Sequence, residues 1–182
     1  MEDKFISERN LRFLLYEVFD TASLTQHAHY EVHSKEVFDM VLETALRLGR
    51  DLLRPNLRDM DQNPPELIDG RIKVHPSVKS LMREWGEGGW LAAPAPMHLG
   101  GQQLPILIYA ACRFVFSAAN YSASIYGSLA SGATRLIQSY GTDEMIKTYL
   151  PKLFAGEWQG TMALTEPQAG SSLSDITTLA LP

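Results

Sequence analysis

The sequence has 182 residues, of which 45% are hydrophobic, and its 16 lysines and arginines against 21 aspartates and glutamates give a formal net charge of -5. It is long enough to bury one sizeable core, and its acidic balance offers no basic field to the phosphate backbone of a nucleic acid. Its apolar runs fall short of the roughly 18 to 20 residues that cross a bilayer. The first ten residues carry charges of both signs, so we expect no membrane span, no signal peptide and a cytoplasmic location.

Helical spacing dominates the first half of the chain. Ser34 is a plausible N-cap, Pro55 is an interruption, and the residues between them repeat apolar side chains at intervals of three and four. This pattern predicts a long amphipathic helix. Its expected apolar positions are Val37, Met40, Val41, Ala45, Leu48 and Leu52.

A shorter helix and a loop are expected next. The helix opens at His75-Pro76 and is closed by Gly86. Residues 86–105 hold too many glycines and prolines for a regular element, yet Trp90 and Leu91 would bury well, so we expect a structured loop. The expected apolar face of the helix consists of Val78, Leu81, Met82 and Trp85.

Residues 105–140 are almost wholly small and apolar, with Arg113 and Arg135 as the only charges. A helix that is apolar nearly all round lies at the centre of a bundle. We expect two central helices here, divided near Asn120. The single cysteine, Cys112, lies within this run and is expected to be a packed structural thiol without a catalytic role.

The pattern changes near the end of the chain. Gly141 closes the second central helix, Thr142 caps a further helix that ends by Gly156, and residues 158–165 then alternate as a strand does. The expected fold is all-α, a helical bundle from about residue 8 to 155, with strand only after Gly156. Because the last strands would lack partners, we interpret the sequence as truncated. The expected parts are an N-terminal extension (1–33), a helical bundle (34–156) and the start of a truncated β domain (157–182).

The loop "TEPQAGSS", residues 165–172, follows this strand. Hydroxyls and free backbone N–H groups in such a loop suit an anionic or heteroaromatic ligand. An ordinary polar hairpin loop would use the same residue types, so the residues alone leave both interpretations open.

Residues Leu164 to Ser171 resemble the acyl-CoA dehydrogenase signature: an aliphatic residue, Thr or Ser, Glu, Pro, two further residues, Gly, and Ser or Thr. The preceding "YGTDEMIKTYLPKLFAGEWQG" and the loop "EGGWLAAPAPMHLGGQQLP" also resemble this family, so that the resemblance covers about residues 80–181. Ser172 departs from the Asp of many members. The N-terminal extension resembles the longer branch that includes 3-methylmercaptopropionyl-CoA dehydrogenase.

The resemblance implies FAD as the cofactor, held by this loop. By position, three residues would line the flavin face, and the Thr165 hydroxyl would bond near N5 or O4 of the flavin. Gly170 would allow close backbone approach, and Ser171 would reach the FAD phosphate or the CoA portion of the substrate. The three residues on the flavin face would be Met162, Ala163 and Leu164.

The resemblance also places the acyl pocket along the second central helix, with Ser124 and Ser128 as substrate-binding candidates beside Ser122 and Ile125. Small residues that permit close helix packing are an equally good interpretation of each position. Tyr121 and Tyr126 would close the pocket or simply pack.

The implied reaction oxidises an acyl-CoA thioester to the 2,3-enoyl-CoA, with an electron-transfer flavoprotein as electron acceptor and a homo-oligomeric full-length protein. In the family the catalytic Glu belongs to a C-terminal helical domain. We therefore expect no catalytic residue within these 182 residues, and an inactive fragment. Glu166 is expected to tether the loop to neighbouring backbone or to cap a helix.

Two other classes remain open. His27, His29 and His33 lie close together, but no carboxylate or cysteine falls at a convincing ligand spacing, so no metal site is expected. A helical interaction module, or a non-catalytic acyl-CoA dehydrogenase-like protein, is the alternative function.

Overall fold

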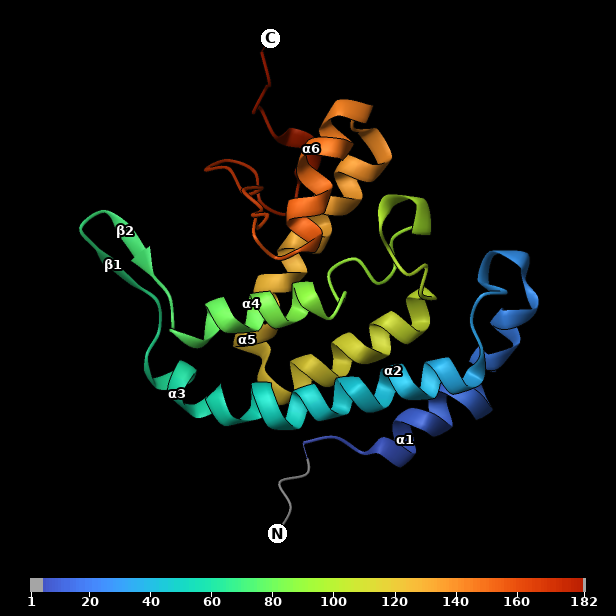
Figure 1. Ribbon diagram of the computed structural model, residues 1–182. Coiled ribbons are helices and arrows are strands. Elements are labelled where there is room, and N and C mark those ends of the chain that lie inside the picture. The colour runs from blue at the N-terminus through green and yellow to red at the C-terminus, as the bar shows by residue number, and fades with distance from the viewer. Residues whose placement is uncertain (1–4, 182) are drawn as a thin grey trace.

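The computed structural model describes residues 5–181, and these form a mostly helical body (Figure 1). The first half of α5 lies between α2 and α4, while α1 lies along the far side of α2 (Figure 1). The all-α class expected from the sequence is confirmed. The elements are α1 (Glu8–Phe13), α2 (Lys35–Leu48), α3 (Leu57–Gln62), β1 (Glu66–Ile68), β2 (Arg71–Lys73), α4 (Ser77–Glu87), α5 (Ile106–Tyr140) and α6 (Asp143–Phe154), with π-helical turns at Leu14–Val18 and Gly49–Leu53 and short 3₁₀ turns at Thr21–Gln26, Ala28–Tyr30, Arg54–Asn56, Met97–Leu99 and Leu173–Asp175.

The expectation that strand appears only after Gly156 is wrong. Within residues 5–181 the paired strands are β1 and β2, an antiparallel hairpin with Leu67 opposite Ile72. Asp69 and Gly70 both have positive φ, 51° and 73°, as a two-residue type I′ turn requires. The hairpin projects from the body beyond α3 (Figure 1). Residues 158–165, expected to form a strand, are extended but have no ladder partner, and a strand without a neighbour leaves its backbone groups unpaired.

The buried face of α2 agrees with the expected one in part. Ser34 is the N-cap, as expected, because its hydroxyl accepts a hydrogen bond from the Val37 N–H at 3.3 Å. Met40, expected to be buried, is instead 59% exposed. Of the other expected residues, Ala45 is fully buried, and Val41, Leu48 and Leu52 are partly buried against the core. The buried residues of α2 are Phe38, Leu42, Ala45 and Leu46.

Asn120 divides α5 into two arms, as the sequence predicts. Its φ of -162° and ψ of 97° are not helical, and it is only 1% exposed. Its amide nitrogen donates to the Leu53 carbonyl at 3.2 Å, and its Oδ1 accepts the Ala123 N–H at 3.0 Å. The side chain therefore caps the second arm and fastens the kink to the π-helical turn after α2.

By length and composition α5 is apolar enough to cross a membrane, which is weak evidence for a span. Half of its most apolar window is buried inside the protein, and the kink at Asn120 interrupts it. Cys112 on the first arm is fully buried, and burial raises the pKa of its thiol to about 12. These are the properties of a core helix, and the expectation of a packed structural thiol is confirmed.

The expected apolar face of α4 is confirmed, since all four of its predicted residues are buried. Trp85 from this face and Trp90 from the following loop pack against Phe116 of α5, with ring centroids 5.8 and 5.1 Å apart. Gly86 does not end α4, which continues to Glu87. A Cβ at Gly86 would lie 2.0 Å from the Ala155 carbonyl oxygen, so the glycine permits close approach to the end of α6.

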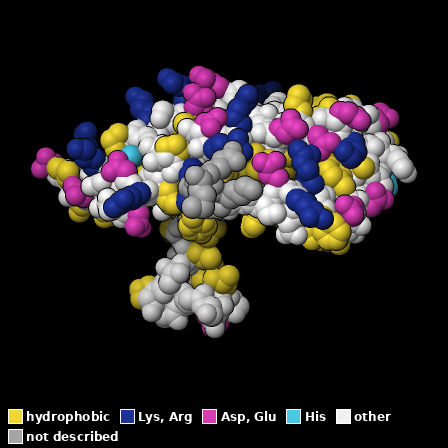
Figure 2. All heavy atoms as spheres, turned by 90° about the horizontal axis from the view of Figure 1, so that it is seen from below, with side chains coloured by type: hydrophobic (Ala, Val, Ile, Leu, Met, Phe, Trp, Pro, Cys, Tyr) yellow, Lys and Arg dark blue, Asp and Glu magenta, His cyan; other side chains and the backbone are white. Residues whose placement is uncertain are grey.

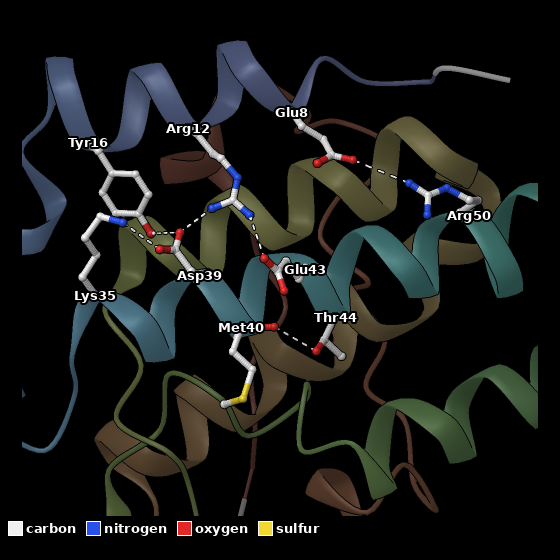
Figure 3. Close-up of polar contacts among 9 residues, drawn as sticks. All are labelled: Glu8, Arg12, Tyr16, Lys35, Asp39, Met40, Glu43, Thr44 and Arg50. Atoms are coloured by element: carbon white, nitrogen blue, oxygen red, sulfur yellow. Dashed lines mark hydrogen bonds and ion pairs between the residues drawn. The ribbon is translucent and has the colours of Figure 1, made fainter. Parts of the chain in front are cut away.

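The N-terminal segment is held to α2 by a polar cluster around Asp39 (Figure 3). The Asp39 carboxylate contacts Arg12, accepts a hydrogen bond from the Tyr16 hydroxyl at 3.0 Å, and pairs with Lys35 at 2.7 Å. Burial and the hydrogen bond to Asp39 raise the pKa of Tyr16. Burial opposes ionisation of Asp39, but the hydrogen bonds from Lys35 and Tyr16 outweigh it and lower the pKa of this carboxyl.

On the face of the molecule shown in Figure 2, positively and negatively charged side chains are interspersed. The boundaries of the three expected parts stay a prediction.

Replacing Asn120 with Ala should lower the free energy of unfolding by about 1–3 kcal/mol, because it leaves the buried Leu53 carbonyl and the Ala123 N–H without this partner. Urea denaturation measures the change. Asn63→Ala is the matched control, since its side chain bonds to exposed Asp59 and its loss should change stability by less than about 0.5 kcal/mol. Equal effects at the two positions would contradict the role given to Asn120.

Candidate functional site

The two arms of α5 face each other across a row of polar contacts. Nearest the kink, the hydroxyls of Ser117 and Ser124 lie 3.3 Å apart. Farther out, Arg113 donates to the Ser128 hydroxyl at 2.5 Å. The side chains that bridge the arms thus lengthen with distance from Asn120, as expected for two helices that diverge. The outermost contact joins the hydroxyls of Tyr109 and Ser131 at 3.2 Å.

A small cavity of about 20 Å³ lies between the arms and the segment that contains α4 and its loop. Most of its wall is apolar, and Ser124 and Ser128, the expected substrate-binding residues, both line it. The residues that line the cavity are Trp85, Trp90, Leu91, Tyr109, Arg113, Phe116, Ser124, Gly127 and Ser128.

A larger, open groove of about 560 Å³ shares four wall residues with this cavity, Leu91, Tyr109, Arg113 and Ser128. Arg135 from the second arm also lines the groove. Both lie beside the two arms of α5, and we call them together the channel between the arms.

The serine hydroxyls in the cavity have partners of their own. The Ser124 hydroxyl donates to the Tyr121 carbonyl at 2.9 Å, and that of Ser128 donates to the Ser124 carbonyl at 3.2 Å. Tyr121 itself is exposed, and Tyr126 packs against the hydrophobic core. Ser122 and Ile125 line neither the cavity nor the groove. The second arm thus brings Ser124 and Ser128 together on one wall and leaves the other expected pocket residues outside it.

The loop expected to bind the cofactor closes as a tight turn. The Glu166 N–H donates to the Ala169 carbonyl at 2.9 Å, and the Ala169 N–H returns a bond to the Glu166 carbonyl at 3.2 Å. Pro167 and Gln168 occupy the turn between them. Ala169 is only 2% exposed, so it anchors the loop.

Glu166 tethers the loop to the chain that follows it. Its carboxylate accepts the backbone N–H groups of Thr177 and Thr178, each at 2.8 Å, and also both of their hydroxyls. The hydroxyl of Thr178 and these backbone N–H groups lower the pKa of Glu166 from 4.5 to about 2. The expectation that Glu166 tethers the loop to neighbouring backbone is confirmed.

The remaining residues expected to bind the cofactor lie on the surface. Thr165, Gly170 and Ser171 are exposed, and within residues 5–181 neither the Thr165 nor the Ser171 hydroxyl has a hydrogen-bond partner. Nothing lies within 4 Å of a Cβ built at Gly170. The loop therefore offers two free hydroxyls beside an open backbone position.

The strand-like residues that lead to this loop, Met162, Ala163 and Leu164, are also exposed. Just before them, a Cβ at Gly160 would lie 2.5 Å from the Cβ of Ala133, so the segment leaves the body against the second arm of α5. None of the residues expected to bind the cofactor lines the channel between the arms. The two predicted groups of site residues are separate within this part of the chain.

The histidines considered as metal ligands have other contacts. The ring nitrogen Nε2 of His33 lies 3.1 Å from the Gln103 carbonyl, and the His29 carbonyl accepts a hydrogen bond from the Gln103 side chain. Across residues 5–181, no group of three or more His, Cys, Asp or Glu side chains is arranged to hold a metal ion.

Arg113 is the site residue that the sequence analysis did not assign. In the sequence, Arg113 stands out only as one of the two charged residues in the long apolar run 105–140. Its place in the channel depends on the kink, which brings it against Ser128, 15 residues later.

Comparison with known proteins finds a match to the family model "Acyl-CoA dehydrogenase, N-terminal domain" over residues 35–157. The 3-methylmercaptopropionyl-CoA dehydrogenase of Ruegeria pomeroyi is 33% identical over 141 residues, which are 78% of this chain and 24% of that protein. A butyryl-CoA dehydrogenase of Syntrophomonas wolfei is 26% identical and is matched by 96% of this chain over 29% of its own length. The chain thus spans less than a third of the length of each of these relatives.

Solved structures show the same fold. Glutaryl-CoA dehydrogenase from Mycobacterium smegmatis superposes with a TM-score of 0.67 at 23% identity, over 81% of this chain and 35% of that one. An acyl-CoA dehydrogenase from Bacillus anthracis, solved in complex with FAD, superposes with a TM-score of 0.64 at 28% identity, over 80% of this chain and 23% of that one. The resemblance stated from the sequence is confirmed.

The attachment of the loop by Glu166 should weaken in acid. Because the folded-state pKa lies below the ordinary value, the contribution of Glu166 is complete above about pH 4.5 and is lost as the pH falls toward 2. An NMR titration of the Glu166 carboxyl should therefore have its midpoint well below 4.5. A Glu166 midpoint at 4.5 would mean that the tether does not form in solution.

Proposed function

Because this chain belongs to the acyl-CoA dehydrogenase family, we propose that it forms the N-terminal part of an FAD-dependent enzyme that oxidises an acyl-CoA thioester to the 2,3-enoyl-CoA. The chain matches the family model over most of its helical body, from residue 35 to 157. The relatives it matches are named as dehydrogenases of acyl-CoA thioesters. The specific acyl group is not part of this proposal.

The loop from Thr165 to Ser171 is the observation that carries the proposal. A free hydroxyl lies at each end, Gly170 leaves its backbone open, and the Glu166 tether holds the turn in one conformation. The Glu166 carboxylate is used within the protein, whereas the Thr165 and Ser171 hydroxyls and the Gly170 backbone are left exposed where a ligand could contact them. These exposed groups fit a ligand that carries hydrogen-bond acceptors and a planar ring system.

The residues fit FAD in the roles that the sequence predicts. Met162, Ala163 and Leu164 are exposed and would face the flavin with a largely apolar edge, and the Thr165 hydroxyl would donate near N5 or O4. Gly170 and Ser171 would approach the phosphates or the CoA portion of the substrate. Bound FAD supplies the acceptor for the hydride that leaves the acyl chain. A donor such as Thr165 stabilises charge that grows as hydride arrives.

The acyl group is assigned to the channel between the arms of α5. Ser124 and Ser128 lie on its wall, and its apolar side is formed by Trp85, Trp90 and Phe116. A mostly apolar cavity with a few polar groups is the usual form of a small-molecule site. In this assignment the serines fix the position of the acyl chain and do not react with it.

The complete reaction is proposed for a longer protein. The chain spans 24% and 29% of the length of two relatives. We assign the base that removes the α proton of the acyl thioester to residues outside this chain. The 182 residues alone are therefore expected to be inactive. We also propose an electron-transfer flavoprotein as electron acceptor and a homo-oligomeric assembly. The cytoplasmic location expected from the sequence stays a prediction.

Thr165→Val in the full-length protein should keep bound FAD but slow its reduction by acyl-CoA about 10- to 1,000-fold, because it removes a donor that acts as charge develops. Stopped-flow bleaching of the flavin absorbance measures the rate. Thr161→Val, four residues earlier and also exposed, is the matched control and should reduce at the parental rate. A parental rate in Thr165→Val would mean that the loop hydroxyl takes no part in the transfer.

Gly170→Val separates ligand binding from folding. Since nothing lies within 4 Å of a Cβ at this position, the substitution should leave the melting temperature of the FAD-free protein unchanged. The added side chain would occupy the space proposed for the ligand, so FAD content should fall. The ratio of flavin to protein absorbance measures this after purification. Full retention of FAD would argue against close approach of the cofactor at Gly170.

A further inference from the structure

We propose that Ser77 is a nucleophile that takes acyl groups from small thioesters and activated esters, with His75 as its general base and Asp59 as the residue that positions His75. The three side chains meet at the start of α4, outside the channel between the arms. This acyl transfer needs neither FAD nor a dehydrogenation step, so it is independent of the proposed function.

The three side chains form one continuous row of hydrogen bonds. The Ser77 hydroxyl lies 2.7 Å from Nδ1 of His75, and Nε2 of the same ring lies 2.9 Å from Oδ2 of Asp59. A nucleophile and a base within hydrogen-bonding distance, with the base oriented by a third group, form the arrangement that activates a hydroxyl. Across residues 5–181, Ser77 is the only serine whose hydroxyl is hydrogen-bonded to an imidazole.

The backbone determines which ring nitrogen acts as the base. The Ser77 N–H also donates to Nδ1 of His75, at 3.3 Å, and a backbone amide nitrogen can only donate. Nδ1 must therefore carry a lone pair. The proton of the neutral ring is then on Nε2, from which it is donated to Asp59. In this tautomer the Ser77 hydroxyl can give its proton to Nδ1.

The neighbouring residues hold this row in place. Asp59 belongs to α3, and its Oδ1 accepts a hydrogen bond from the Asn63 side chain at 2.7 Å, so that Oδ2 is left for His75. The hydrogen bond from His75 lowers the pKa of Asp59, which keeps this carboxylate ionised. Pro76 has a φ of -56°, which its ring restricts, between the histidine and the serine. The imidazole is only 10% exposed, while Ser77 is partly exposed, so the base is shielded beside an accessible serine.

This arrangement supports acyl transfer to Ser77. Its Oγ attacks the acyl carbon, and Nδ1 of His75 takes the hydroxyl proton. The bond from that carbon to the sulfur of a thioester, or to the oxygen of an aryl ester, then breaks, and the leaving thiolate or phenolate takes the proton from Nδ1. The product is an O-acyl serine. As the first residue of α4, Ser77 lies at the positive end of the helix dipole, which stabilises the negative charge that develops on the acyl oxygen.

The surroundings of Ser77 favour small acyl donors. Ser77 lines neither the cavity nor the groove that make up the channel between the arms. A donor would reach it from solvent, without the apolar wall that a long acyl chain requires. We therefore assign acetyl-sized groups to this site.

The test measures acetylation of Ser77 in the full-length protein, with p-nitrophenyl acetate and acetyl-CoA as the two probes. Absorbance follows the release of p-nitrophenolate, and mass spectrometry of proteolytic peptides locates the acetyl group. The parental protein should carry the group on Ser77 with both probes, and Ser77→Ala should lose the burst of p-nitrophenolate. Ser80→Ala is the matched control, because this exposed serine on the same helix donates to the Ser77 carbonyl at 2.9 Å, and it should leave the rate unchanged.

Variants of the other two residues separate catalysis from structure. His75→Ala should slow acetylation of Ser77 about 100-fold, the lower end for a positioned general base, and added imidazole should restore part of the rate. Asp59→Asn should slow it about 2- to 5-fold, because the Asp59 side chain is 63% exposed. Nitrogen NMR of the His75 ring should find the proton on Nε2 in the parental protein and a mixture of tautomers in Asp59→Asn. Thermal melting establishes that each variant folds.

The contrary outcomes are equally specific. The proposal is overturned if Ser77 carries no acetyl group, or if His75→Ala is acetylated at the parental rate. Equal labelling of Ser77 and Ser80 would give Ser77 the reactivity of an ordinary surface hydroxyl, which also overturns it. Flavin reduction by acyl-CoA is measured on the same parental protein. Its absence would refute the proposed function and leave this inference untouched.

Discussion

One buried amide determines the shape of this molecule. Asn120 interrupts a long apolar helix, and its side chain satisfies both the Ala123 N–H at the start of the second arm and the Leu53 carbonyl at the end of a neighbouring segment. Buried polar groups are costly unless they are paired, so the kink and its attachment form together. The channel between the arms exists because the chain turns here, and a straight α5 would leave Arg113 and Ser128 far apart.

The helices could be predicted because their signals are local. Ser34 and Thr142 act as N-caps, the face of α4 is buried, and Asn120 divides the central helix, all of which the sequence indicates through residues near one another. The failures have different causes. Met40 lies three residues after Val37, as the expected pattern requires, but the packing of α2 leaves it exposed. The β1–β2 hairpin did have a local signal, the Asp69-Gly70 pair, which lies between Leu67-Ile68 and a strand that contains Ile72.

Some residues of the candidate site could likewise be predicted from the sequence, and others could not. Residues 162–171 were identified by resemblance, and the tether by Glu166 was expected from its chemistry, but its partners Thr177 and Thr178 could not be named from spacing alone. Ser124 and Ser128 were identified as pocket residues, whereas Arg113 was seen only as an isolated charge. Its role depends on a contact across the kink, and no periodicity along the chain encodes how two helices meet in space.

The close contact between α4 and the end of α6 has a consequence for how the protein tolerates change. Gly86 faces the Ala155 carbonyl, and a Cβ at Gly156 would lie 2.4 Å from the Met82 carbonyl, so each segment supplies a glycine against the backbone of the other. The direction in which the chain leaves the helical body is therefore set by main-chain atoms. An added methyl group at either glycine would meet a main-chain carbonyl and would change the direction in which the chain continues.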